Sequence, residues 1–142
     1  MGNKEKIEIL EVPSDTGFLD NIRNFVKNIA QHFQFQEEDI DDIEFAVDEA
    51  VANIIEHAYE GQPGQITIKV ICNENKFAIE ISDKGKKFDP TKSKMPDLDK
   101  HHKKKKTGGL GIYIMRKLMD KINYHYEENN GNFLSMEKYK KN

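Results

Sequence analysis

Apolar side chains in the first half of the chain recur first in a strand-like pattern and then twice in a helical one. Residues 6–12 (KIEILEV) are rich in apolar residues and stop at Pro13, which predicts a strand. Residues 14–33 and 37–61 repeat apolar side chains at helical spacing, which predicts two amphipathic helices. The second helix is expected to bury Ile40, Ile43, Val47, Ala50, Val51, Ile54 and Ala58 and to end at Gly61.

The spacing changes again in the second half of the chain. Residues 65–82 alternate apolar and polar side chains around a polar turn, which is the pattern of an antiparallel hairpin. Residues 108–120 return to helical spacing, and residues 121–127 and 132–139 predict two closing strands around a glycine-containing turn. The apolar positions four apart in the third helix are Leu110, Ile114 and Leu118. This order predicts an α+β two-layer sandwich, with a mostly antiparallel sheet and helices on one face.

Three polar residues interrupt the apolar second helix at regular spacing. Glu49, Asn53 and His57 lie four positions apart, so an α-helix would place them on one stripe. A solvated helix face is the simplest explanation of such a stripe. A ligand site is the alternative, and the later segments of the chain favour it.

The hairpin is followed by a segment, ISDKGKKFDP, that combines a carboxylate with a glycine. Asp83 comes at the strand end, and Gly85 permits a turn that a Cβ atom would block. A carboxylate in a partly enclosed pocket is a good acceptor for an exocyclic amine such as that of adenine. An ordinary Asp-x-Gly turn would have the same sequence.

A second glycine segment, TGGLGIYIM, lies where the third helix is expected to begin. Bare backbone N–H groups at a helix start bind phosphate, although a flexible hinge would also use glycines. The spacing fits neither a Walker A loop nor a Rossmann turn. The preceding residues 89–107 have no apolar period and contain the lysine run Lys103–Lys106, and a loop of this length in a compact domain is usually functional or disordered.

Composition limits the class of protein. The 142-residue length suits one domain over residues 1–142, and a net charge of −3 with 33% charged residues gives no global bias toward nucleic acid. Apolar runs are far shorter than the ~20 residues of a membrane helix. The single cysteine, Cys72, excludes an internal disulfide. A cytoplasmic protein that contacts neither membrane nor nucleic acid directly is the expectation.

The order and spacing of the three segments resemble the N, G1 and G2 boxes of the GHKL ATPase superfamily, which has the Bergerat fold. Glu49-x-x-x-Asn53 is similar to the N box, Asp83-x-Gly85-x-x-Phe88 to G1, and Gly109-Leu110-Gly111 to G2, with residues 89–107 as the ATP lid. Within the superfamily, the segments "DEAVANIIEHAYEG" and "GGLGIYIMRKLMD" most resemble those of bacterial anti-sigma factor serine kinases. His32 is the only histidine in residues 1–40 and lies in a short amphipathic segment, which argues against a sensor histidine kinase.

The resemblance implies a role for each matching residue. Asn53 would coordinate Mg²⁺, Glu49 would be the general base, and Asp83 would accept the adenine amine. Gly85 would let the base approach the backbone, and the backbone from Gly108 onward would bind the phosphates. The residues expected to contact ATP are Asn53, His57, Asp83, Gly85, Phe88, Thr107, Gly108, Gly109, Leu110, Gly111 and Ile112.

Two positions depart from the superfamily pattern. Lys87 stands where G1 often has a second glycine. For the threonine that often lies near the adenine on a late strand, this chain offers Asn132 or Ser135.

The function that the resemblance implies is an anti-sigma factor serine/threonine-protein kinase. Such a protein binds ATP and Mg²⁺, phosphorylates a small anti-anti-sigma partner, sequesters a sigma factor and forms a homodimer through its first strand or its sheet. Two alternatives stay open at this point. One is a nucleotide-gated binding module without turnover, and the other is a stand-alone ATPase or histidine-kinase-like domain.

Overall fold

The structure, a computed structural model, describes residues 4–92 and 108–141 of the chain. The predictions on Lys103–Lys106 and Thr107, and most of the expected lid, lie outside the described residues. No helix in these two ranges is long and apolar enough to cross a membrane.

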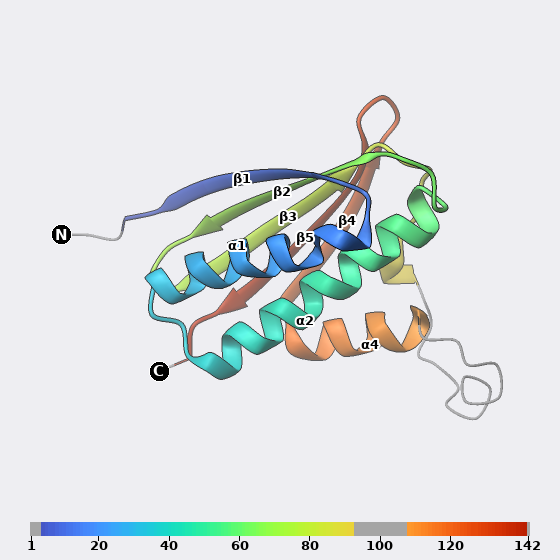
Figure 1. Ribbon diagram of the computed structural model, residues 1–142. Helices are drawn as coiled ribbons and strands as arrows, with labels where there is room; N and C mark the ends of the chain where they lie inside the picture. The colour runs from blue at the N-terminus through green and yellow to red at the C-terminus, as the bar shows by residue number, and fades with distance from the viewer. Residues whose placement is uncertain (1–3, 93–107, 142) are drawn as a thin grey trace.

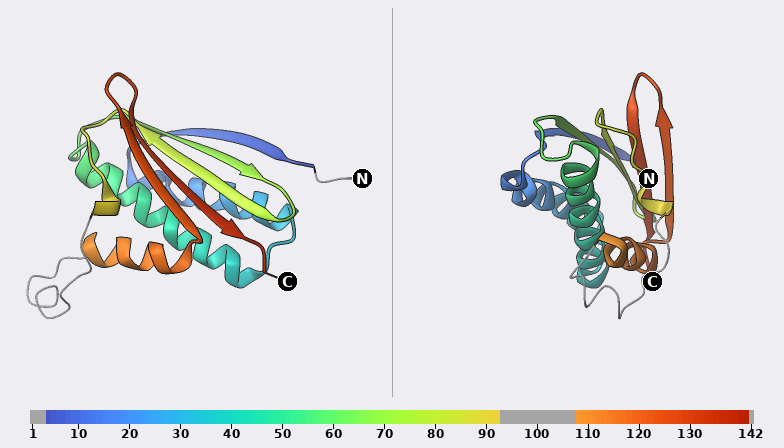
Figure 2. Two further views of the ribbon diagram at one scale, coloured as in Figure 1. Left: turned by 180° about the vertical axis from the view of Figure 1, so that it is seen from behind. Right: turned by 90° about the vertical axis from the view of Figure 1, so that its right-hand side faces the viewer.

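Five antiparallel strands form one sheet in the order β1-β2-β3-β5-β4 (Figure 1). The strands are β1 (Lys6–Pro13), β2 (Gln65–Cys72), β3 (Lys76–Asp83), β4 (Lys121–Glu127) and β5 (Gly131–Tyr139). The helices α1 (Leu19–His32), α2 (Glu37–Asn53) and α4 (Gly108–Leu118) all cover the same face of this sheet, as both views in Figure 2 show. The α+β two-layer sandwich is therefore confirmed.

The core lies between the helices and the inward-facing residues of the strands. Strand alternation places Ile66, Ile68 and Val70 of β2 at 0% exposure, as the hairpin pattern predicts. The seven residues expected on the core face of α2 and its extension are all buried. The buried positions of the last helix and its end are Ile112, Met115 and Met119. Ile114 and Leu118 of the predicted stripe are only partly buried, so Ile112, Met115 and Met119 face the core instead of these two residues.

The sequence predicts one α-helix that runs to Gly61, but the α-helical part of this segment is shorter. The α-helical part ends at Asn53, and Ile54–Ala58 form a π-helical turn in which the backbone N–H of Tyr59 donates to Ile54 O at 2.9 Å. Gly61 then takes a positive φ of 79° and ends the segment. The wider π turn breaks the predicted regular stripe between Asn53 and His57, and such turns are frequent at functional sites.

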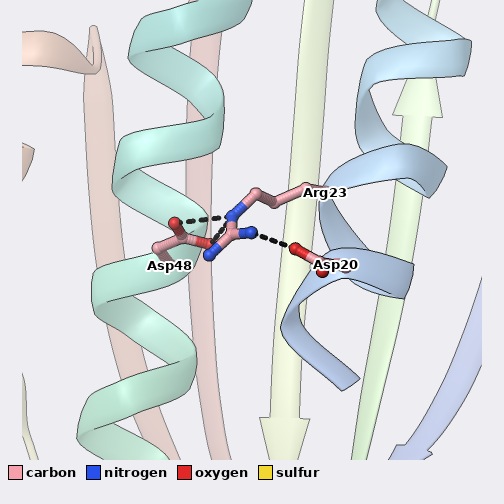
Figure 3. A network of polar contacts seen from close by, with 3 residues as sticks. All are labelled: Asp20, Arg23 and Asp48. Carbon is pink, nitrogen blue, oxygen red and sulfur yellow. Dashed lines mark hydrogen bonds and ion pairs between the residues drawn. The ribbon is translucent and has the colours of Figure 1, made fainter. Parts of the chain in front are cut away.

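A three-residue ion network joins α1 to α2 (Figure 3). Arg23 Nε donates to both carboxylate oxygens of Asp48, at 3.1 and 2.9 Å, and Nη1 pairs with Asp20. The Asp48 carboxylate raises the pKa of Arg23, so the guanidinium stays charged. The network links α2 to α1 at the position next to Glu49.

A buried lysine joins α2, α4 and β5. Lys138 on β5 is 3% exposed; its Nζ donates to Asp42 Oδ2 of α2 at 3.0 Å and to the carbonyl oxygen of Leu118 at the end of α4. Because a buried charge is costly unless it is paired, this arrangement restrains the separation of the two helices.

Candidate nucleotide-binding site

Asp83 is a buried carboxylate at the end of β3, with one oxygen held and the other available. Its Oδ1 accepts hydrogen bonds from the backbone N–H of Gly85 at 2.8 Å and from Asn132 Nδ2 at 2.9 Å. Within residues 4–92 and 108–141, no group donates to Oδ2. Burial raises the pKa of Asp83, and the two hydrogen bonds lower it in part. The carboxylate is thus oriented by the protein and keeps an acceptor for a ligand.

Asn132 links Asp83 to the segment that follows it. Its Nδ2 also donates to Lys86 O at 2.9 Å, and its Oδ1 accepts from the backbone N–H of Phe88 at 3.0 Å and from the hydroxyl of Tyr124. Asn132 is 4% exposed, so its side chain is buried while the groups it bonds lie partly at the surface. A buried polar network in which every member has partners orients its groups rigidly.

The sheet register separates the two late-strand candidates. Asn132 pairs with Asp83 and faces the helices, whereas Ser135 pairs with Glu80 and faces the open side of the sheet. Asn132 is therefore the candidate that reaches the site. Tyr124 was not predicted from the sequence, although its place between Ile122 and Tyr126 in a short strand was the available signal.

Gly85 allows the segment after β3 to pack on the π-helical turn. A Cβ atom at Gly85 would lie 2.6 Å from the carbonyl oxygen of Ala58, and the N–H of Lys86 donates to that same oxygen at 2.8 Å. The close packing against Ala58 is thus a second reason for a glycine at position 85, and the sequence did not indicate it. The predicted approach of the adenine to this backbone stays a prediction.

His57 supports Phe88. The two rings stack with centroids 4.6 Å apart and planes at 17°, and the His57 side chain is 38% exposed. Phe88 lines the pocket described next, whereas His57 does not. A direct contact of His57 with ATP stays a prediction. In the structure the His57 ring stacks on Phe88, which forms part of the pocket wall.

A narrow pocket brings the N-box and G1 residues together. Its cavity volume is about 20 Å³, far below the ~300–1,000 Å³ usual for ligand pockets, so it can enclose only a small part of a nucleotide. Its polar lining consists of Asn53, Asp83, Tyr124 and Asn132. The apolar walls include Phe88, Pro90 and Ile81. The sequence-predicted residues Asn53, Asp83 and Phe88 thus meet at one site.

Asn53 and Glu49 present oxygens from α2 to which no described residue is bonded. Asn53 is 6% exposed, and no described residue forms a hydrogen bond with its side chain. Glu49 lies one turn earlier, is partly buried, and likewise has no hydrogen-bond or ion partner in residues 4–92 and 108–141. Burial, and then the charge of Asp48, raise the pKa of Glu49. An amide oxygen of this kind fits Mg²⁺, which prefers hard oxygen ligands.

The start of α4 supplies the third predicted part of the site. The helix begins at Gly108, so the backbone N–H groups of its first turn have no helical acceptor. Ile112 is 2% exposed in the core, so only its backbone is open to a ligand role. Phosphate binding by Gly108, Gly109, Leu110, Gly111 and Ile112 stays a prediction.

The fold and this pocket define a class of nucleotide-binding domain. Residues 12–138 match the family model of the histidine kinase-like ATPase domain, and the chain belongs to this family.

Within that class, the chain is similar to proteins named serine-protein kinase RsbW. It is 31% identical over 124 residues to the Listeria monocytogenes protein, covering 84% of this chain and 79% of that one. It is 33% identical over 139 residues to a Bacillus cereus protein, covering 95% and 85%. The Bacillus pumilus protein is 30% identical over 145 residues, covering 95% and 88%. These similarities confirm the resemblance inferred from the three boxes.

Asp83→Asn should weaken nucleotide binding without weakening the fold. An amide can keep both bonds at Oδ1 but presents N–H where Oδ2 would accept the adenine amine, so we expect ADP affinity to fall about 10- to 100-fold. The pKa of Asp83 is higher in the folded protein than in the unfolded chain. Ionisation of Asp83 therefore lowers the free energy of unfolding as the pH rises from the unfolded-state pKa through the folded-state pKa. At pH 7 the variant should therefore unfold in urea at the same or a higher concentration.

Calorimetric titration with ADP and urea unfolding measure both effects. Asp41→Asn is the matched control, since Asp41 is exposed on α2. Unchanged ADP affinity in Asp83→Asn would contradict the assignment of Asp83.

Proposed function

We propose that this protein is a serine/threonine-protein kinase that transfers the γ-phosphoryl group of ATP to a small partner protein. The observation that carries the proposal is that Asp83 and Asn53 line one pocket, each with an oxygen to which no described residue is bonded. Glu49 lies one helical turn before Asn53 on α2. The similarity to serine-protein kinases supports the choice of acceptor.

The chain's own groups would hold the nucleotide at both ends. Asp83 Oδ2 accepts the exocyclic amine of adenine, while Gly85 and Asn132 hold Oδ1. The N–H groups at the start of α4 bind the phosphates. The amide oxygen of Asn53 would hold Mg²⁺, which neutralises charge on the phosphates when bound.

Glu49 would act as the general base. The acceptor hydroxyl oxygen forms a bond to the γ-phosphorus, the bond from that phosphorus to the ADP oxygen breaks, and the hydroxyl proton moves to the Glu49 carboxylate. Partial burial, which raises the pKa of Glu49, makes this carboxylate a stronger base than an exposed one. Phosphoryl transfer needs positioning and charge neutralisation more than covalent help, so one base and one metal ligand suffice.

The proposal extends to partners through the resemblance to anti-sigma factor kinases. The phosphoacceptor would be an anti-anti-sigma protein, and a sigma factor would be the protein held inactive in the cytoplasm. The similarity in the N, G1 and G2 segments supports this extension.

We also propose that a second copy of this chain covers the open face of the sheet near β1. Ile7 and Ile9 on this edge strand are 55% and 60% exposed and point away from the helices. Ile7 pairs with Ile71, so the apolar surface continues onto β2. Exposed apolar side chains grouped at a sheet edge favour association.

Glu49→Gln should abolish most phosphotransfer while keeping nucleotide binding. The amide has nearly the same shape but cannot accept the proton, so we expect a loss of about 100- to 1,000-fold in kcat. The measurement is transfer of labelled phosphate from ATP to a candidate anti-anti-sigma protein from the same organism. Glu56→Gln is the matched control, since Glu56 is exposed on the π-helical turn.

Each alternative function gives a different result in this assay. Equal rates in wild type and Glu49→Gln would remove Glu49 as the base. ATP binding without turnover, with the partner present, would support the nucleotide-gated module. An acid-labile phosphoproduct would indicate phosphohistidine, whereas phosphoserine is stable in acid.

Ile9→Glu should dissociate the proposed homodimer. The substitution places a charge in the apolar contact, so light scattering should give a dimer mass for wild type and a monomer mass for the variant. Asn123→Glu adds the same side chain to the same face of the sheet on β4, and should leave the dimer intact. A monomeric wild type, or a dimer that survives Ile9→Glu, would contradict the proposed interface.

A further inference from the structure

Gly111 lies directly against the carboxylate of Glu49. A Cβ atom on Gly111 would lie 2.1 Å from Glu49 Oε2 and 2.8 Å from Cδ, and the third nearest atom is Glu49 Cγ at 3.5 Å. Gly111 belongs to the start of α4 and Glu49 to the last part of α2. The contact thus joins the helix proposed to bind phosphate to the residue proposed as the base.

This contact restrains a side chain that the described residues do not hold by any polar bond. Within residues 4–92 and 108–141, Glu49 forms no hydrogen bond or ion pair, and the charge of its neighbour Asp48 repels it. A glutamate has three rotatable side-chain bonds, so its carboxylate takes the place that the surrounding surface allows.

We propose that Gly111 is a positioning residue, whose missing Cβ leaves the space that holds the Glu49 carboxylate in place to accept the proton of the phosphoacceptor. This inference rests on the proposed role of Glu49. A base must be held within a fraction of an ångström of its working position, so the shape of this space matters for rate.

The surrounding structure determines what would move if Gly111 carried a methyl group. Lys138 binds Asp42 of α2 and the last turn of α4, and Ile112 and Met115 of α4 are buried. The two helices are therefore restrained against moving apart. The end of the Glu49 side chain is flexible, so it should turn aside while the fold remains.

Gly111→Ala should therefore separate catalysis from binding. We expect kcat for phosphotransfer to fall about 10- to 100-fold, and KM for ATP and the affinity for ADP to change by a smaller factor, because alanine keeps the backbone N–H proposed to bind phosphate. The urea midpoint should not fall, because alanine favours a helix more than glycine does. Gly17→Ala is the matched control, because Gly17 lies in a short helical turn before α1, in contact with Asp15.

A second readout tests the contact itself without any activity. The ¹³C signal of the Glu49 side-chain carboxyl, in protein without nucleotide, should shift in Gly111→Ala and not in Gly17→Ala. Glu49→Asp shortens the side chain by one methylene, so adding Gly111→Ala to Glu49→Asp should lower kcat by less than about threefold.

Three outcomes would overturn the inference: an unshifted carboxyl signal, a KM that rises as much as kcat falls, or an equal loss of kcat in the Glu49→Asp background. The failure of the proposed function has a different signature. In that case wild type would transfer no phosphate, or Glu49→Gln would transfer it normally, while the carboxyl signal would still report the contact.

Discussion

The buried carboxylate of Asp83, with one oxygen hydrogen-bonded to Gly85 and Asn132, is the constraint on which the rest of the site depends. Asp83 is taken out of water at the end of β3, and this burial is tolerable because Gly85 and Asn132 both donate to Oδ1. Asn132 in turn binds the backbone at Lys86 and Phe88, so the chain after β3 is pinned to β5. The oxygen left over has a fixed direction, which is what recognition of an adenine amine requires.

Helix packing brings the catalytic candidates to this carboxylate. The π-helical turn ends with Ala58, whose carbonyl accepts from Lys86 and fits closely against Gly85. Lys138 restrains the separation of α2 and α4, and Gly111 meets Glu49 across that interface. The site is thus assembled from three segments distant in sequence, and the histidine kinase-like ATPase family to which the chain belongs accounts for their spacing.

Sequence patterns predicted the layers of the fold and the principal pocket residues, because those depend on local periodicity and on short motifs. They could not choose between Asn132 and Ser135, since only the register of β5 against β3 decides which side chain faces the helices. The π-helical turn was also missed, because Ile54 and Ala58 are four positions apart in the sequence whether the backbone bonds there are α-helical or π-helical. In the last helix, Ile114 and Leu118 are as apolar as Ile112, Met115 and Met119, and only packing against the sheet selects the latter three for the core.

Discrimination between ATP and inosine triphosphate tests the central claim most directly. The two nucleotides differ at position 6 of the purine, where inosine carries an oxygen in place of the amine. With Asp83 Oδ2 as the acceptor, that oxygen would face another acceptor, so ATP should bind at least about tenfold more tightly in calorimetric titrations. Equal affinities for ATP and inosine triphosphate would contradict the account.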